Sequence, residues 1–443
     1  MKIVNLALLG TLLLLTACSG ETQFPEPTGK GTFRALNAIS TSPEMVFRLE
    51  ESGTETIAYR SASPSRRFDD FEYTFNFEVN FPGELQIRRV ASVTTKIEAN
   101  KDFTFVATGA VENPTILTWV ADERTFEADA TIAEIRFAHL AESEDSVDIY
   151  LAPAGTPPAL GEARGTLAYG EILPPIDVDS GSYVLTVTAA GDPATVIFQS
   201  GTANYLPQTA LILAIFDATA DETAPVITRG LATAGGSSFT LTDTRFPSTI
   251  QFVQASRTLD AVDIYDDAAL TNPVATALPY KGVTAPIDIV NSETTYSFTP
   301  AGSTGAVLLE SVVTPIGGTR YDHYSLGQAD VLGSIWGPRD TQPVEIYPTL
   351  SLTNALVNEQ VVDVYVVAPG TDIENRPPRF TALYGFLSGR LPLEAGTYEI
   401  IVTADDSKTP LASIEVTLAA GDVARYAAFE TADPNVIELL PVP

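Results

Sequence analysis

The feature that most constrains the fold of this chain is a short motif that occurs three times along it. The stretches read SVDIY, AVDIY and VVDVY, and each places one aspartate inside a β-branched run: Asp148, Asp263 and Asp363. Nine positions upstream of each aspartate, a short apolar strand carries one polar side chain: His139, Gln254 and Asn354. Several ordered matches at constant spacing indicate internal duplication.

Each copy also places a tyrosine after a small polar turn, in the stretches DSGSY, SETTY and EAGTY. The tyrosines Tyr183, Tyr296 and Tyr398 follow the aspartates of their copies by 35, 33 and 35 positions. A fourth, degenerate copy opens the chain. It keeps a polar residue in Asn37 but has Val46 in the aspartate position and Leu85 in the tyrosine position.

The strands predicted by this pattern are short and alternate apolar with polar residues, and no segment keeps a helical period. About seven strands in roughly 100 residues is typical of an immunoglobulin-like sandwich, and a tyrosine after the turn predicts a tyrosine corner, in which the phenol reaches a backbone group. We therefore expect an all-β chain, a tandem array of four immunoglobulin-like antiparallel β-sandwich domains.

The expected domain ranges are 32–128, 132–232, 248–337 and 347–443. A Gly/Ser/Thr-rich stretch, ATAGGSSFTLTD, is expected as the connector between the second and third domains. Because domains in a tandem array contact mainly their neighbours, the array is expected to be elongated.

The first residues indicate where the protein resides. Lys2 precedes a mostly apolar segment, residues 3–15, that is too short to span a bilayer. The following Leu15-Thr16-Ala17-Cys18 resembles the lipobox of bacterial lipoproteins, and Cys18 is the only cysteine of the chain. The resemblance implies removal of residues 1–17 as a signal peptide, acylation of Cys18 and a polar tether over residues 18–31. An ordinary signal peptide that contains a cysteine is the alternative.

In lipoproteins of Gram-negative type, a serine such as Ser19 after the acylated cysteine implies release to the outer membrane. We therefore expect a protein anchored to the bacterial outer membrane by Cys18. The chain carries 56 acidic and 25 basic residues, a formal charge of −31. Such a surface is a poor partner for nucleic acid or anionic lipid headgroups.

The order of apolar strand, polar residue, VD(I/V)Y and (A/S)G(T/S)Y resembles the bacterial family called domain of unknown function 4397. Members occur in secreted and lipid-anchored envelope proteins. By these motifs the second and fourth copies match best, the third less well and the first only in outline. The family carries no established catalytic residues, so the resemblance implies a fold and a location and no activity.

Side chains suited to catalysis are few. A position filled by His139, Gln254 or Asn354 alike favours a hydrogen-bonding role for His139, and His323 in RYDHYSL is expected at the surface. No GxSxG elbow is present, and two distant histidines do not form a usual zinc ligand set. Trp119 and Trp336 are candidate platforms for sugars, but core or inter-domain contacts are the favoured interpretation.

Carboxylates are plentiful, and a solvated acidic surface is the favoured interpretation of most. Paired carboxylates also suit glycoside hydrolysis or calcium binding. The best calcium candidate is DAVDIYDD, with Asp260, Asp263, Asp266 and Asp267. For the repeated Asp148, Asp263 and Asp363 we expect a structural role, accepting hydrogen bonds from backbone N–H groups of the incoming loop. A cation ligand is the competing interpretation.

The sequence thus predicts a non-enzymatic, lipid-anchored envelope protein that acts as a structural or binding array for a protein or polysaccharide. No cofactor is expected, calcium excepted. Two alternatives stay open: a carbohydrate-active hydrolase that uses paired carboxylates, and a calcium-binding adhesion module.

Overall fold

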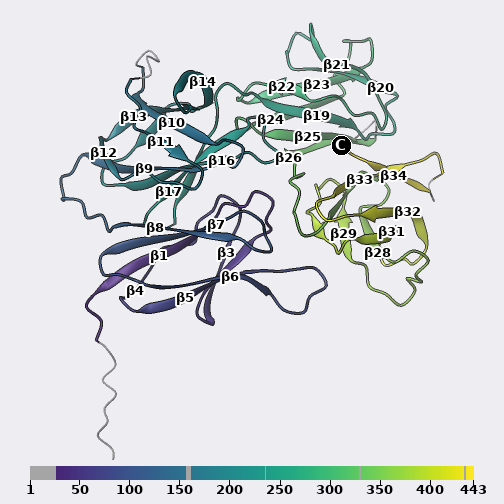
Figure 1. The fold of residues 1–443 in the computed structure, drawn as a ribbon. Coiled ribbons are helices and arrows are strands. Elements are labelled where there is room, and N and C mark those ends of the chain that lie inside the picture. The colour runs from purple at the N-terminus through teal and green to yellow at the C-terminus, as the bar shows by residue number, and fades with distance from the viewer. Residues whose placement is uncertain (1–25, 156–160, 235, 329–330, 434–435) are drawn as a thin grey trace, which may run out of the picture.

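The computed structural model describes residues 26–155, 161–234, 236–328, 331–433 and 436–443, and Figure 1 shows how they fold. Their secondary structure consists of β-strands that form eight sheets, two to each quarter of the chain. The expected all-β fold of antiparallel β-sandwich domains is confirmed. Within these ranges, no helix is long and apolar enough to cross a membrane.

The first domain packs sheet β4-β1-β7-β8 against sheet β3-β2-β5-β6. Its strands are β1 Lys30–Asn37, β2 Met45–Leu49, β3 Ser52–Ile57, β4 Arg66–Asp69, β5 Glu72–Val79, β6 Arg88–Lys96, β7 Lys101–Thr108 and β8 Thr115–Asp122. The second domain packs β12-β9-β16-β17-β18 against β11-β10-β13-β14, with β15 on β13. Its strands are β9 Ile132–Leu140, β10 Ser146–Pro153, β11 Gly165–Ala168, β12 Ile176–Asp179, β13 Gly181–Ala189, β14 Asp192–Gln199, β15 Ala203–Tyr205, β16 Ala210–Asp217, β17 Val226–Ala232 and β18 Ser238–Leu241.

The third domain pairs sheets β22-β19-β25-β26 and β21-β20-β23-β24, and the fourth pairs β30-β27-β33-β34 and β29-β28-β31-β32. The strands of the third are β19 Ser248–Gln254, β20 Ala261–Tyr265, β21 Pro273–Pro279, β22 Ile287–Ile289, β23 Thr294–Pro300, β24 Leu309–Val313, β25 Arg320–Gln328 and β26 Val331–Pro338. Those of the fourth are β27 Thr349–Asn354, β28 Val361–Val367, β29 Phe380–Leu383, β30 Leu391–Pro392, β31 Gly396–Ala404, β32 Pro410–Leu418, β33 Val423–Glu430 and β34 Ile437–Pro441.

One strand pair in each domain is parallel. The first strand of the domain lies beside the third strand of its own sheet in chain order, in the pairs β1–β7, β9–β16, β19–β25 and β27–β33. All other strand pairs between these elements are antiparallel. The repeated unit is therefore a sandwich with one parallel contact, the same in every copy.

Each domain has a core of its own between its two sheets. The reason is the alternation of side chains along a strand. In β5, Phe75, Phe77 and Val79 all face inward and are fully buried, and Phe75 lies 4.4 Å from Phe105 of β7, centroid to centroid.

The connector expected between the second and third domains contains a strand. Residues Ser238–Leu241 form β18, which pairs antiparallel with β17 and extends the sheet of the second domain. The ring of Phe239 packs over Gly230, where a Cβ would clash with it. The second domain therefore continues beyond the expected limit at residue 232.

Two apolar interfaces join the domains in pairs. The first and second domains meet through a buried cluster that includes Leu36, Trp119 and Phe216. The third and fourth meet in the same way through a cluster that includes Tyr324 and Phe429. Trp119 thus makes the inter-domain contact that the sequence favoured, and its indole Nε1 donates to Gly170 O at 3.1 Å.

A tyrosine crosses each of these interfaces in the same way. Tyr59 donates its hydroxyl hydrogen to Asp217 O at 2.8 Å, and Tyr280 donates to Glu430 O at 2.9 Å. The residue after each tyrosine is a cation with a left-handed backbone, Arg60 at φ 62° and Lys281 at φ 66°, and each lies over the tyrosine ring. The two domain pairs are therefore built alike.

The first and fourth domains also touch. Glu345, which precedes the fourth domain, accepts hydrogen bonds from Thr41 Oγ1 and Val111 N of the first at 3.3 and 3.2 Å. Gly83 lies directly against the carboxylate of Glu394. The expectation of an elongated array is wrong, because the fourth domain lies beside the first, as Figure 1 shows.

Candidate functional site

The polar position at the end of each first strand has the same hydrogen bonds in all four copies. The side-chain acceptor at this position accepts a hydrogen bond from the backbone N–H of the residue two positions later in the chain. The side-chain donor at this position donates to the residue five positions later. For His139 these are Ala141 N at 3.4 Å and Glu144 O at 2.8 Å, and for Asn354 they are Leu356 N at 3.0 Å and Glu359 O at 2.8 Å. The hydrogen-bonding role predicted for His139 is confirmed. Burial lowers the pKa of this histidine, which favours the neutral ring that the two bonds need.

The repeated aspartates accept hydrogen bonds from the turn of a neighbouring hairpin. Each carboxylate takes a backbone N–H from a residue with a left-handed backbone: Asp148 from Gly191 at 2.7 Å, Asp263 from Gly302 at 2.7 Å and Asp363 from Asp406 at 3.2 Å. The donors lie 39 to 43 positions downstream of the aspartates and not in the incoming loop. In each of the three copies, the carboxylate therefore holds this turn against its own strand.

The second carboxylate oxygen distinguishes the copies. That of Asp263 accepts the N–H of Ala277 at 2.7 Å, and that of Asp148 accepts the hydroxyl of Thr166 at 2.5 Å. In the first domain, Val46 fills the aspartate position, and the chain between β5 and β6 is the longer loop of residues 80–87.

Two of the three predicted tyrosines form tyrosine corners. Tyr183 donates to Asp179 O at 2.9 Å and Tyr398 donates to Glu394 O at 2.8 Å, in both cases four residues back. Tyr296 lies two residues further into its strand than these tyrosines do, and it packs in the core, 5.1 Å from the ring of Phe252.

The prediction that Leu85 fills the tyrosine position of the first copy is wrong. Leu85 lies in the loop between β5 and β6 and is fully exposed. The strand pairing Val46↔Glu78, set beside Asp148↔Thr188, places Tyr73 where Tyr183 stands.

The prediction of a surface histidine at position 323 is wrong. His323 is fully buried, stacks on Phe298 at 5.3 Å and contacts Ser311 Oγ through Nε2 at 2.9 Å. Burial lowers its pKa to about 3. The polar stretch RYDHYSL does not lie at the surface, because β25 is covered on both faces. The core of the third domain covers one face, and the fourth domain covers the other.

The calcium candidate at residues 260–267 is not assembled in the structure. Both carboxylate oxygens of Asp263 accept hydrogen bonds from backbone N–H groups, and the carboxylate of Asp267 accepts the N–H of Thr271 at 3.1 Å. Across the described ranges, the group of three carboxylates with oxygens within 4.8 Å of one another is Asp363, Asp405 and Asp406. Asp260 and Asp266 do not join such a group.

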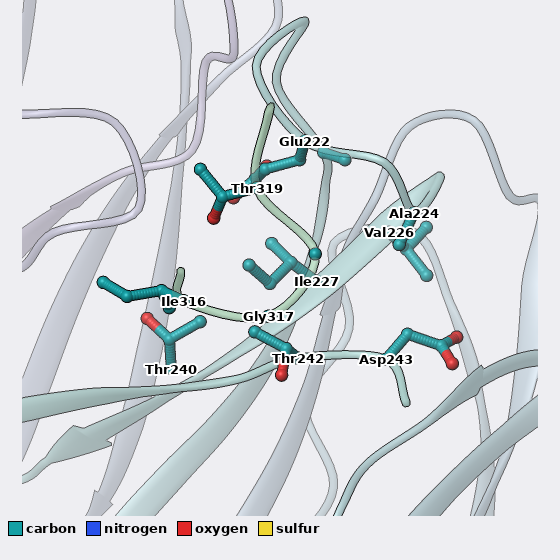
Figure 2. A pocket seen from close by; sticks show the side chains of 12 residues that line it. Glu222, Ala224, Val226, Ile227, Thr240, Thr242, Asp243, Ile316, Gly317 and Thr319 are labelled. Carbon is teal, nitrogen blue, oxygen red and sulfur yellow. The ribbon is translucent and has the colours of Figure 1, made fainter. Parts of the chain in front are cut away.

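A cleft of about 150 Å³ lies between the second and third domains (Figure 2). Its walls come from the β16–β17 loop, from β17 and β18, and from the loop that precedes β25. Apolar side chains form most of the surface, and three threonines also line the cleft: Ala218, Ala224, Val226, Ile227, Ile316, Thr240, Thr242 and Thr319. Ile316 is 69% exposed at this cleft. A cavity of this volume suits a group the size of one benzene ring.

Backbone contacts hold the two walls of the cleft together. Thr223 N donates to Gly318 O at 2.9 Å, and Arg320 Nε donates to Glu222 O at 3.0 Å. Gly318 has a left-handed backbone at φ 74°, which lets the loop turn against the second domain.

The carboxylates at the cleft are already paired with arginines. Glu222 binds Arg60 at 2.8 Å, and Asp243 binds Arg245 at 2.6 Å. A smaller cleft between the third and fourth domains is lined by Asp322 and Asp340, which pair with Arg339 and Arg390 at 2.8 and 2.7 Å. Neither cleft therefore presents two unpaired acids to a glycosidic bond. No sequence pattern marks the larger cleft, because its walls come from separate segments of two domains.

Trp336 packs against the core of the third domain and Trp119 lies between domains, so neither forms an exposed platform. Cys18 lies outside the described residues.

A model of the family described as Domain of unknown function (DUF4397) matches residues 31–150. The resemblance seen in the motifs is confirmed, although on the copy that the motifs matched only in outline. That copy keeps the strand order, the polar Asn37 and Tyr73, and the match continues to Tyr150 in β10. No curated protein matches the chain.

Proposed function

For a chain whose residues 31–150 match this domain family, we propose the role of a lipid-anchored, non-enzymatic protein of the bacterial outer membrane that binds a partner in the envelope. The observation that carries the proposal is the use of the repeated polar groups. The aspartates, the tyrosine corners and His139 hold turns and strands of their own domains. Such groups build a scaffold, and the carboxylates of both clefts are bound by arginine.

A protein suits this scaffold better as a partner than a polysaccharide does. Sugar-binding surfaces use exposed aromatic rings, whereas Trp119 and Trp336 both pack against other apolar side chains. The cleft between the second and third domains offers a mostly apolar pocket, suited to one apolar side chain of a partner.

The anchor is tested by metabolic labelling with a fatty acid, followed by separation of inner and outer membranes. Wild type is expected to carry the label in the outer membrane fraction, and Cys18→Ala is expected to lose both label and membrane association. Ser19→Asp is the matched control: it should keep the label and move to the inner membrane. A Cys18→Ala protein that stays labelled and membrane-bound would refute the anchor.

One observation favours a second candidate, a calcium-binding module. The oxygens of Asp363, Asp405 and Asp406 lie close enough together to share one cation. Calcium should then raise the unfolding temperature of the fourth domain, and Asp405→Asn should abolish the effect.

A further inference from the structure

The sheet β4-β1-β7-β8 of the first domain ends in β8, and no described segment pairs with the outer edge of that strand. The strand reads TILTWVAD, and residues 115–121 contain no charged residue, proline or glycine. Such an edge carries a row of backbone groups ready to pair with another strand.

The other long edge strands carry the features that usually prevent such pairing. Some contain charges, prolines or glycines: Arg88, Arg89 and Lys96 in β6, Gly333, Gly337 and Pro338 in β26, Pro410 and Glu415 in β32, and Glu438 and Pro441 in β34. The edge of β14 is covered by Arg245, which donates to Val196 O and Ile197 O at 2.7 and 2.6 Å. The bare edge of β8 is therefore a particular feature of the first domain.

The second domain shows what occupies this position when it is filled. The row Ala35↔Phe105↔Thr118 in the first domain corresponds to Phe137↔Leu213↔Gly230 in the second, so β8 and β17 are equivalent. The strand β18 pairs antiparallel with residues 228–231 of β17. By this register, the equivalent edge in the first domain is residues 116–119.

We infer that β8 binds an extended segment of a partner protein, added antiparallel to the sheet as β18 is added to β17. Backbone hydrogen bonds supply the affinity, and alternate side chains of the segment contact the exposed Thr118 and Val120. The formal charge of −31 disfavours a second copy of the chain and favours a neutral or basic segment. The inference rests on the proposed role as a binding protein and names the kind of partner.

The test uses the full chain in detergent and a synthetic peptide with the sequence of residues 237–242 and two lysines at each end. Hydrogen–deuterium exchange follows the amides of β8. At saturating peptide these amides should exchange at least tenfold more slowly. Thr118→Lys should remove the protection, because a charge at this edge opposes pairing. Thr94→Lys, an exposed threonine on the edge strand β6, should keep it.

Unchanged exchange in β8 overturns the inference, and so does equal protection of β6 and β8. Protection that grows with protein concentration in the absence of peptide identifies a second copy as the occupant and overturns the assignment to a different protein. Because the experiment does not depend on acylation, its result is separate from that of the anchor test.

Discussion

Replacing Asp263 by alanine tests whether the repeated aspartates hold the fold. Asp263 is 6% exposed, and its carboxylate accepts the N–H groups of Ala277 and Gly302, both at 2.7 Å. Its loss removes two hydrogen bonds to a charged group, each of which contributes about 1.5–3 kcal/mol. We therefore expect Asp263→Ala to lower the free energy of unfolding of the third domain by about 2–5 kcal/mol.

The same change in the fourth domain should cost less. Asp363 accepts one N–H, from Asp406 at 3.2 Å, and lies beside the carboxylates of Asp405 and Asp406. Removing it relieves repulsion between like charges, so Asp363→Ala should cost about 1 kcal/mol or less, with calcium or with chelator.

The assay is hydrogen exchange of the full chain at increasing urea, read on peptides from β20–β24 and from β28–β32. Asp288→Ala, at an exposed position of the third domain, controls for the change in net charge. A cost below 0.5 kcal/mol for Asp263→Ala, or equal costs for both aspartates, would refute the reasoning from bond counts. A calcium effect lost in Asp363→Ala would instead support the metal interpretation.

Three further outcomes are expected. His323, with a pKa of about 3 in the folded chain against about 6.5 when unfolded, stays neutral in the native state, so stability should fall as pH drops below 6.5. The loss should reach about 2 kcal/mol by pH 5 and be smaller in His323→Gln, as Trp336 fluorescence during urea unfolding will show. Burial raises the pKa of Asp102 to about 6, so its contribution to stability is lost as pH rises from 4 to 6; Asp102→Asn should raise the unfolding temperature at pH 8 and not at pH 4. Tyr280→Phe should weaken the contact between the third and fourth domains by about 0.5–1.5 kcal/mol, seen as faster exchange at the end of β33 with unchanged exchange in the first domain.

The repeat and its spacing were sufficient to predict the sandwich, because alternation and turn residues are local signals. A further repeat was present in the sequence and was missed. Tyr59, Tyr169 and Tyr384 precede Tyr73, Tyr183 and Tyr398 by fourteen positions each. The earlier tyrosine of each pair has no distinctive local pattern. Only comparison of the copies could therefore have revealed that Tyr59, which bridges two domains, belongs to a repeat.

The burial of His323 and the cleft between the second and third domains could not be predicted in this way. Each depends on contacts between segments that are far apart in the chain. His323 lies in the core of its own domain, against Phe298 and Ser311, and the cleft exists because residues 221–223 bind the start of β25. Local sequence carries no information about such contacts until the tertiary arrangement is known.

The contacts of Glu345 with Thr41 and Val111 have a consequence for the order in which the chain folds. They join residues 304 and 234 positions apart, so they cannot form until three domains have been synthesised. Loop-closure entropy makes contacts of such separation slow to form, whereas each sandwich folds from nearby strands. Until then the surface of the first domain around Thr41 and Val111 stays without its partner. A chain exported from its amino end would pass through a stage in which completed domains wait for the last one, and that stage is the one most exposed to aggregation and proteolysis.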